Sequence, residues 1–344
     1  MTTRAIYPFT AIVGQEQMKL ALVLNVINPK IGGVLIRGEK GTAKSTAVRA
    51  LADLLPERLV VADCPFHCLP DEEAQLCPQC QAQKGAWKMV PSKMRVVDLP
   101  ISATEDRVVG TLDIEHALQT GEKRFEQGVL AEANGNILYV DEINLMDDHI
   151  VDILLDAAAM GANIVEREGI SYSHPAGFCL VGTMNPEEGD VRPQLLDRFG
   201  LVVEVQGEHS LQARTEVIKR RLAFEQAPEG FAVQYQAQQS HVAADIARAK
   251  TLLPNAIVHD ATIELAARIA LEMGVDGHRA DITMVKAAKT LAAYRQRTEV
   301  TQEDLLAAAA LVLPHRLRRR PFDVTHFDQD SVRKVMERMN GEQG

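Results

Sequence analysis

The sequence predicts an α/β domain with a parallel sheet, followed by a smaller domain made only of helices. Up to about residue 208, short apolar strand candidates alternate with helix candidates, a pattern typical of parallel sheets. Beyond that point almost every segment reads as a helix. The 344 residues and 46% hydrophobic content suffice for two cores, which we place at 1–208 and 259–344 with a helical linker at 209–258.

A glycine-rich loop follows the first clear strand candidate. Val34-Leu35-Ile36 is a short apolar run, and a helix-compatible stretch from Thr46 to Leu55 ends before Pro56. Between them lies Gly38-Glu39-Lys40-Gly41-Thr42-Ala43-Lys44-Ser45. Strand, loop and helix in this order are the context of a phosphate-binding loop, so the segment predicts nucleoside triphosphate binding.

The residue types of this loop suit phosphate and Mg²⁺. Gly38 and Gly41 let the backbone turn and aim amide groups at phosphate oxygens. Lys44 can reach the β- and γ-phosphates, and Ser45 can ligate Mg²⁺. The strict pattern has glycine at Ala43; alanine costs little if this residue has a negative φ, and on that basis we interpret the loop as a variant. The predicted nucleotide-binding set is Gly38, Gly41, Thr42, Ala43, Lys44, Ser45, Thr46 and Asp141.

A second motif predicts hydrolysis of the bound nucleotide. The strand-like run Ile137–Val140 ends at Asp141 and Glu142. A carboxylate at Asp141 can hold Mg²⁺, and Glu142 can polarise the attacking water as a general base. The alternative, a strand capped by two solvated acids, is the weaker interpretation beside a phosphate loop.

Two polar residues further along the chain are candidates for the same reaction. Asn185 follows the strand candidate Phe178–Thr183 and can orient the attacking water; the alternative is a turn asparagine before Pro186. Arg198 is placed to reach a neighbouring subunit's nucleotide as an arginine finger; the alternative is a surface arginine paired with Asp197.

The second half of the chain predicts a helical bundle. The expected helices are Leu211–Glu225, Gln234–Lys250, Asp260–Met273, Ile282–Gln296 and Thr301–Leu313. Pro228-Glu229-Gly230 is expected to break the first of these helices, and Thr301 with Asp304 marks a helix start. Arg279 lies where the fourth helix begins and is expected to reach back to the nucleotide on the first domain; the alternative is pairing with Asp276 or Asp281.

Two insertions are expected in the α/β domain, at about 62–100 and 160–178. The second reads as a hairpin that turns near Glu168-Gly169. The first holds Cys64, Cys68, Cys77 and Cys80 within 17 residues. Such clustering favours a metal over disulfides in a cytosolic protein, and four thiolates suit structural zinc. The alternative, of equal weight, is four reduced cysteines in a surface loop; Cys179 is expected in the core.

Charge and hydropathy limit the partners. Lys plus Arg number 37 and Asp plus Glu 47, so the net charge of −10 argues against extended nonspecific nucleic-acid binding. The best candidate for a basic patch is Arg316-Leu317-Arg318-Arg319-Arg320; its alternative is a helical-domain end that is solvated or paired with carboxylates. No apolar run reaches the ~18 residues of a membrane helix and the start lacks a signal-peptide segment, so we expect a cytoplasmic protein.

Several longer segments closely resemble the I-subunit family of magnesium chelatase, which are AAA+ ATPases. The similarity covers roughly residues 5–320 and is densest in Ala103–Asp113, Leu130–Asn134, Val140–His149, Asn185–Gly189 and Arg192–Gly200. It implies Lys44 and Ser45 as Walker A residues, Asp141 and Glu142 as Walker B, Asn185 as sensor 1, Arg198 as arginine finger and Arg279 as sensor 2. It also implies ATP and Mg²⁺, a hexameric ring, a larger von Willebrand-domain partner and a porphyrin-binding subunit that inserts the metal.

Two functions therefore compete at the level of sequence. The first is an ATP-driven motor of a metal-insertion complex, which the segment Ala103–Asp113 favours. The second is a ring ATPase of the MoxR-like or helicase-like kind that remodels another protein or nucleic acid. Basic hairpins would favour a nucleic-acid motor, whereas the second insertion carries Glu166, Arg167 and Glu168.

Overall fold

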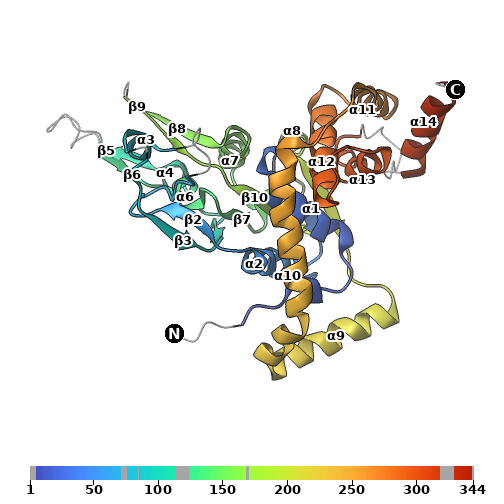
Figure 1. The fold of residues 1–344 in the computed structure, drawn as a ribbon, viewed down its shortest axis with the longest axis horizontal. Helices are drawn as coiled ribbons and strands as arrows, with labels where there is room; N and C mark the ends of the chain where they lie inside the picture. The colour runs from blue at the N-terminus through green and yellow to red at the C-terminus, as the bar shows by residue number, and fades with distance from the viewer. Residues whose placement is uncertain are drawn as a thin grey trace.

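A five-stranded parallel sheet lies at the centre of the first domain, as predicted. The computed structural model describes residues 5–70, 76–83, 85–113, 124–167, 170–317 and 329–342 (Figure 1). The strand order is β11-β1-β10-β7-β4, and every neighbouring pair is parallel. The strands are β1 (Val34–Gly38), β4 (Val96–Asp98), β7 (Ile137–Val140), β10 (Cys179–Met184) and β11 (Leu201–Val205).

Helices cover both faces of this sheet, so its strands are apolar throughout. Alternate residues of a strand point to opposite faces. Val34 and Ile36 therefore join the core beneath α1 and α2, whereas Leu35 between them joins the core beneath α7. These three helices are α1 (Glu16–Ile27), α2 (Lys44–Leu54) and α7 (Asp148–Met160).

The insertions form small sheets and short helices beside the main sheet. The predicted hairpin is present as β8 paired with antiparallel β9, and its turn at Glu168-Gly169 lies outside the described residues. The remaining elements are β2 (Arg58–Val61), α3 (Pro78–Ala82), β3 (Met89–Ser92), α4 (Glu105–Val109), β5 (Thr111–Asp113), β6 (Arg124–Glu126), α6 (Val129–Ala133), β8 (Ala162–Arg167) and β9 (Ile170–Pro175). In Figure 1 the β5–β6 and β8–β9 hairpins and α3 lie on the side of the sheet away from the helical domain.

The second half is helical, with one boundary that differs from the prediction. The helices are α8 (Pro193–Leu196), α9 (Leu211–Gln226), α10 (Pro228–Leu252), α11 (Asp260–Glu272), α12 (Arg279–Tyr294), α13 (Gln302–Val312) and α14 (Gln329–Glu342). The expected break after the first of these helices is present, because α9 ends at Gln226 and Ala227 leaves the helical backbone, but α10 begins at Pro228 and not at the predicted Gln234. Proline is tolerated in the first turn of a helix, where its missing N–H would have no intrahelical acceptor.

One hydrophobic core joins the helical domain to the sheet. Leu24 of α1 belongs to the same buried cluster as Leu265 of α11, Met284 of α12 and Leu305 of α13. The predicted domain boundaries at residues 208 and 258 stay predictions. No helix in the described part of the chain is both long and apolar enough to cross a membrane.

A buried carboxylate lies in the first turn of α13, the helix whose start the sequence predicts at Thr301. Thr301 and Asp304 form a capping box, and the Asp304 side chain is fully buried. Arg295 and Arg297 donate to Asp304 Oδ1 over 2.9 and 2.6 Å. Burial acts to raise the pKa of Asp304, but the hydrogen bonds from Arg297 and Thr301 prevail and hold that pKa below its usual value.

Replacing this carboxylate should destabilise the helical domain. Asp304→Ala removes the carboxylate half of the capping box and leaves two arginines without their shared partner, so we expect a loss of about 3 kcal/mol of unfolding free energy at neutral pH. Because the folded pKa is depressed, this stabilisation is present above the ordinary aspartate pKa and disappears as the pH falls through the folded value. The difference from wild type should therefore shrink below about pH 4.

Urea unfolding followed by circular dichroism at pH 7 and at pH 3 measures this difference. The control is Asp98→Ala, which removes a half-exposed ion pair with Arg49 (2.8 Å) and should change stability by less than about 0.5 kcal/mol. Equal effects of the two substitutions at pH 7 would contradict the role of Asp304.

Candidate functional site

The carboxyl ends of three neighbouring strands bring the predicted motifs together. β1 ends at the phosphate loop, β7 ends at Asp141 and Glu142, and β10 ends next to Asn185. Since β10 pairs in parallel with both β1 and β7, all three ends lie at one edge of the sheet. Segments that are about a hundred residues apart in the sequence thus line a single pocket.

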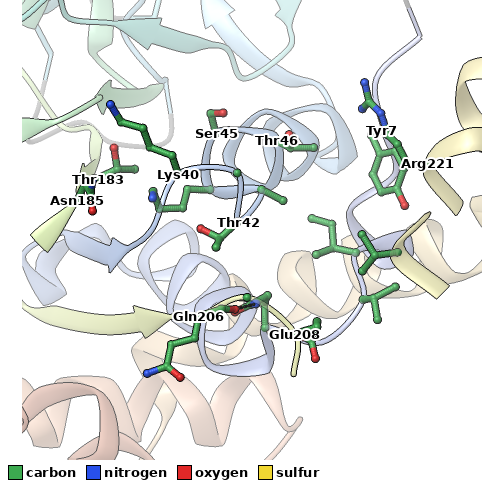
Figure 2. Close-up of a pocket in the computed structure, with 18 of the residues that line it drawn as sticks. Tyr7, Lys40, Thr42, Ser45, Thr46, Thr183, Asn185, Gln206, Glu208 and Arg221 are labelled. Atoms are coloured by element: carbon green, nitrogen blue, oxygen red, sulfur yellow. Dashed lines mark hydrogen bonds between the residues drawn. The ribbon is translucent and has the colours of Figure 1, made fainter. Parts of the chain in front are cut away.

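This pocket has a volume of about 900 Å³. Figure 2 shows the phosphate loop crossing it, with Thr183 and Asn185 at one end and Tyr7 and Arg221 at the other. Of the predicted nucleotide-site residues, the following line it: Gly41, Thr42, Ala43, Lys44, Ser45, Thr46, Asp141, Glu142 and Asn185.

Two backbone positions in the phosphate loop are sterically demanding. A Cβ on Gly38 would lie 2.1 Å from the Val205 carbonyl oxygen, so only glycine fits beside β11. The condition that Ala43 has a negative φ is not met, because its φ is 60°. A left-handed alanine costs about 1–2 kcal/mol, which explains why the strict pattern has glycine there.

The ammonium of Lys44 lies inside the curve of the loop. Its Nζ donates to the carbonyl oxygens of Gly38 (2.6 Å) and Glu39 (2.8 Å). Burial lowers the pKa of Lys44, and the charges of Asp141 and Glu142 oppose that shift. The positive charge is therefore held next to the two acids at the end of β7.

Asp141 is fixed by two hydroxyl groups that are not among the predicted site residues. Thr183 Oγ1 donates to Asp141 Oδ1 over 2.5 Å, and Tyr139 donates to the same oxygen over 3.0 Å. Burial raises the pKa of Tyr139 well above its usual value, so the phenol remains a donor. Both residues lie within the predicted strands; Tyr139 is two residues from Asp141 in the chain, whereas only strand pairing brings Thr183 beside it.

Glu142 occupies a strained position beside a second cation. Its backbone is left-handed, with φ 53° and ψ 49°, and such strain gathers at functional sites. Lys40 of the phosphate loop lies 3.4 Å from Glu142 and 2.5 Å from Glu188. Lys40 and Glu188 are not among the predicted site residues, because their pairing depends on the turn that follows β10.

Asn185 is buried at the end of β10, with 5% of its surface exposed. Its side chain accepts a hydrogen bond from Glu187 N, which fixes the amide beside the acids of β7. The part of the pocket farthest from β7 is lined by α9, a helix that the sequence assigned only to the linker. Its Val217, Ile218 and Arg221 line the pocket together with the phosphate loop.

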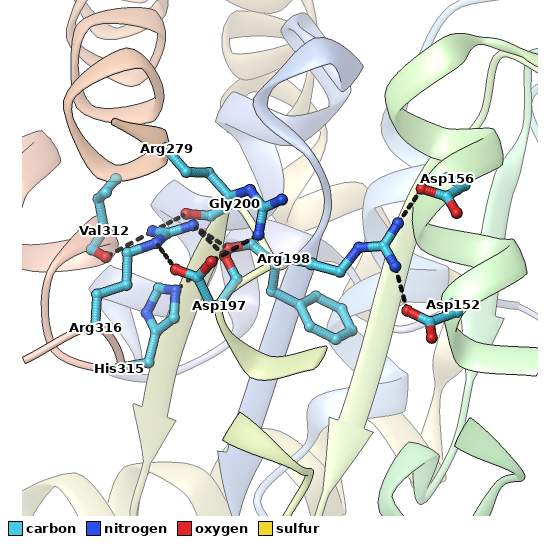
Figure 3. Close-up of polar contacts among 10 residues, drawn as sticks. Asp152, Asp156, Asp197, Arg198, Gly200, Arg279, Val312, His315 and Arg316 are labelled. Atoms are coloured by element: carbon cyan, nitrogen blue, oxygen red, sulfur yellow. Dashed lines mark hydrogen bonds and ion pairs between the residues drawn. The ribbon is translucent and has the colours of Figure 1, made fainter. Parts of the chain in front are cut away.

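Arg198 lies away from the pocket of its own chain. It follows α8 and is not among the residues that line the pocket. Its guanidinium donates to Asp152 and Asp156, one turn apart on α7 (Figure 3). The alternative of pairing with Asp197 is therefore not what the structure shows.

Arg279 lies near Arg198 and not at the pocket. The structure places it at the first turn of α12, where its Nη1 donates to Asp197 Oδ2 over 2.6 Å. This contact differs from the expected position of Arg279 at the nucleotide of its own chain. It also differs from the alternative, a pairing with Asp276 or Asp281. Figure 3 shows Arg279 on one side of Asp197 and the side chain of Arg198 extending to the other.

Arg316 is not part of an exposed basic patch and instead matches the alternative of an arginine paired with a carboxylate. Its side chain is 1% exposed and lies near Asp197, 3.2 Å from Oδ1. It also donates to the carbonyl oxygens of Phe199 (2.6 Å) and Val312 (2.7 Å). The residues 318–320 lie outside the described part of the chain. Arg316 therefore fastens the end of α13 to the segment that carries Arg198.

The four cysteines of the first insertion converge. Cys64, Cys68, Cys77 and Cys80 are all buried, and their sulfur atoms lie within 4.8 Å of one another. The Cys64 and Cys77 sulfurs are 3.8 Å apart, and hydrogen bonds from Cys68 and Cys77 lower the pKa of Cys64. Cys179 is a separate core residue, 3% exposed, as expected.

Comparisons with known proteins agree with this architecture. The model of the AAA domain, dynein-related subfamily, matches residues 82–199, and that of the AAA lid domain matches residues 263–335. A putative ATPase from Cytophaga hutchinsonii is similar in fold, with a TM-score of 0.61, 15% identity and coverage of 96% of this chain and 91% of that chain.

Similarity to magnesium-chelatase subunits extends over nearly the whole chain. A Magnesium-chelatase subunit ChlI homolog of Methanocaldococcus jannaschii is 56% identical over 98% of this chain and 92% of its own length. Magnesium-chelatase subunit ChlI of Synechocystis sp. is 50% identical, with coverage of 99% and 96%. A chain in a structure of the complex between subunits BchI and BchD of magnesium chelatase is 46% identical, with a TM-score of 0.55 and coverage of 92% and 98%. The chain belongs to the ChlI family of magnesium-chelatase AAA subunits.

Proposed function

We propose that this protein is the ATP-hydrolysing motor subunit of a magnesium-chelatase-like complex. The observation that carries the proposal is the convergence of the phosphate loop, two acids and Asn185 at one edge of the sheet. ATP hydrolysis is the activity of this chain, and partner subunits insert the metal into the tetrapyrrole. The MoxR-like or helicase-like alternative is not favoured, given the near full-length similarity to ChlI subunits.

Each residue of the site has a distinct task in this proposal. ATP with Mg²⁺ supplies the phosphoryl group when bound. Lys44 neutralises phosphate charge, and the oxygens of Ser45 and Asp141 are the metal ligands on the protein side. Glu142 takes a proton from the attacking water, and Asn185 orients that water. Thr183 and Tyr139 hold Asp141 in position by donating to one of its oxygens.

Arg198 and Arg279 serve a neighbouring subunit's nucleotide in this proposal. Both lie close to Asp197, and neither lines the pocket of its own chain. A guanidinium group stabilises the charge on a phosphoryl group during its transfer only if it reaches that group. Because neither arginine lines the pocket of its own chain, the nucleotide that they reach must be bound to a second copy of the chain. We therefore assign the chain to a homo-oligomer and take its form, a hexameric ring, from the resemblance.

The proposed partners and metals complete the assignment. A structure of the BchI and BchD complex contains a similar chain, which supports a second chelatase subunit as partner; we assign it the von Willebrand domain, and a third subunit the porphyrin. Mg²⁺ in the ATP site and a structural Zn²⁺ at Cys64, Cys68, Cys77 and Cys80 are the two metals. A cytoplasmic location stays a prediction from the sequence.

Substitutions in the pocket should separate binding from hydrolysis. Lys44→Ala should abolish most ATP binding, because the phosphates lose the cation inside the loop. Glu142→Gln should bind ATP normally and hydrolyse it about 10²–10⁴-fold more slowly, the usual contribution of a general base. Fluorescent-nucleotide titration and phosphate release measure the two steps, with the exposed Lys93→Ala as control. A normal turnover rate in Glu142→Gln would refute its assignment as general base.

Mixing of inactive subunits tests the action of Arg198 across an interface. Arg198→Ala should bind ATP but lose about 10³–10⁵-fold in rate. When it is mixed with Lys44→Ala, some interfaces combine an intact Lys44 with an intact Arg198 from the neighbour, so ATPase activity should partly return. Arg279→Ala mixed with Lys44→Ala should behave in the same way. Arg192→Ala, which removes an exposed arginine paired with Asp148 on α7, is the control and should keep its activity.

Native mass spectrometry shows whether both subunits share a ring. Mixed rings without recovery for Arg198 would show that it acts within its own chain or not at all. If ATPase activity recovers in mixed rings with Arg198→Ala but not with Arg279→Ala, Arg198 acts across the interface and Arg279 acts on the nucleotide of its own chain. A pull-down of tetrapyrrole-binding and von Willebrand-domain proteins from native lysate tests the assignment to a chelatase.

A further inference from the structure

The first insertion contains little hydrophobic core of its own. The buried cluster that holds it together is Val61, Cys64, Phe66, Cys68, Leu76, Cys77, Cys80 and Ala131, so four of its eight buried members are cysteines. A small unit with so few large apolar side chains generally needs a disulfide or a metal to hold its shape. The four cysteines are not joined by disulfides, so a metal is the cross-link that their side chains can provide.

The sulfur positions suit a single tetrahedral zinc ion. Four sulfurs that each lie about 2.3 Å from zinc are about 3.8 Å apart, which is the distance between Cys64 and Cys77 sulfurs. Backbone N–H groups donate to the sulfurs as well, from Cys77 to Cys68 (3.2 Å) and from Cys80 to Cys77 (3.5 Å). Such bonds orient thiolate ligands. The spacing within 4.8 Å leaves room for one ion and not for a multi-iron cluster.

Phe66 connects this cysteine knuckle, the segment that carries the four cysteines, to both hairpins. It lies in the turn between Cys64 and Cys68 and is 2% exposed. Its ring stacks on His174 of β9 at 4.9 Å and on Phe125 of β6 at 6.2 Å. Phe125 in turn stacks on Tyr172 of β9 at 4.5 Å. One aromatic ring of the knuckle thus joins two hairpins that are distant in the sequence.

The backbone of the same turn is bonded to the main domain. The Phe66 carbonyl oxygen accepts from Asn134 Nδ2 over 2.8 Å, and Asn134 Oδ1 accepts from Gly177 N over 2.9 Å. Gly177 lies just before β10, which begins at Cys179. The turn is therefore held on both sides, by the cysteine sulfurs and by Asn134, which also binds the segment before β10.

We infer that the zinc-bound cysteine knuckle anchors the β5–β6 and β8–β9 hairpins through Phe66. The inference rests on zinc at the four cysteines, which is part of the proposed function. Zinc fixes Cys64 and Cys68 and so fixes the turn between them. The ring of Phe66 then holds His174 and Phe125, and the two hairpins keep one orientation relative to the sheet. Loss of zinc frees the turn and, with it, both hairpins.

Zinc analysis and amide hydrogen exchange of the full chain test this anchor. Tag-free protein purified without chelator should contain about one zinc per chain by plasma mass spectrometry. Cys77→Ser with Cys80→Ser should lose the zinc, and exchange in β6 and β9 should rise about tenfold or more. Phe66→Ala should keep the zinc and show the same rise in both hairpins, because only the ring is lost. In both variants β7 and β10 should stay protected.

Phe231→Ala is the matched control, because it removes a buried ring from a different aromatic cluster with Tyr7 and Phe224. It should leave exchange in β6 and β9 unchanged. Iron, or no metal, in the wild-type chain would overturn the anchor together with the zinc. Zinc with unchanged hairpin exchange in Phe66→Ala would overturn the anchor and leave the zinc site standing. Neither outcome bears on the nucleotide site, whose failure would appear in ATP binding.

Discussion

Parallel pairing of β1, β10 and β7 is the constraint on which the rest of the structure depends. It aligns the carboxyl ends of the three strands, and each of these ends carries one part of the nucleotide site. Antiparallel pairing would send alternate ends to opposite edges of the sheet. Parallel strands need long crossovers, and the helices that make them cover both faces, so the site is held on a sheet buried on both sides.

The site shows strain and close packing where the chemistry is expected. Ala43 and Glu142, at the ends of the loop and of β7, both have left-handed backbones although neither is glycine. Thr183 holds Asp141 at 2.5 Å, and Lys40 spans the gap between Glu142 and Glu188. The charged groups compensate one another across three different strand ends. Such a cluster is stable only because the sheet fixes its members in place.

The three arginines around Asp197 differ from the charged residues of the pocket in what holds them. Arg316 is buried and satisfied by carbonyl oxygens and Asp197, so it fastens the helical domain to the core. Arg198 and Arg279 are held by carboxylates nearer the surface, and the proposed function assigns both to an interface with a neighbouring subunit. Arg279 is half-exposed, so its ion pair contributes little to stability, whereas Arg198 is 23% exposed and paired with two aspartates.

The sequence by itself determined the local elements and the family. The phosphate loop, the acids after β7 and the cap at Thr301 depend on nearest neighbours in the chain, so most of the predicted helices and strands agree with the structure to within a few residues. The start of α10 at Pro228, ahead of the predicted Gln234, differs because proline also fits the first turn of a helix. Near full-length similarity to ChlI subunits bears out the family.

Only the tertiary structure decided which distant residues meet. The contacts of Thr183 with Asp141, of Lys40 with Glu188 and of Phe66 with His174 join segments more than forty residues apart. The positions of Arg279 beside Asp197 and of Arg316 inside the core are of the same kind. Sequence patterns report the environment of each residue along its own helix or strand. The partner of a side chain depends on how those elements pack, which no local pattern contains.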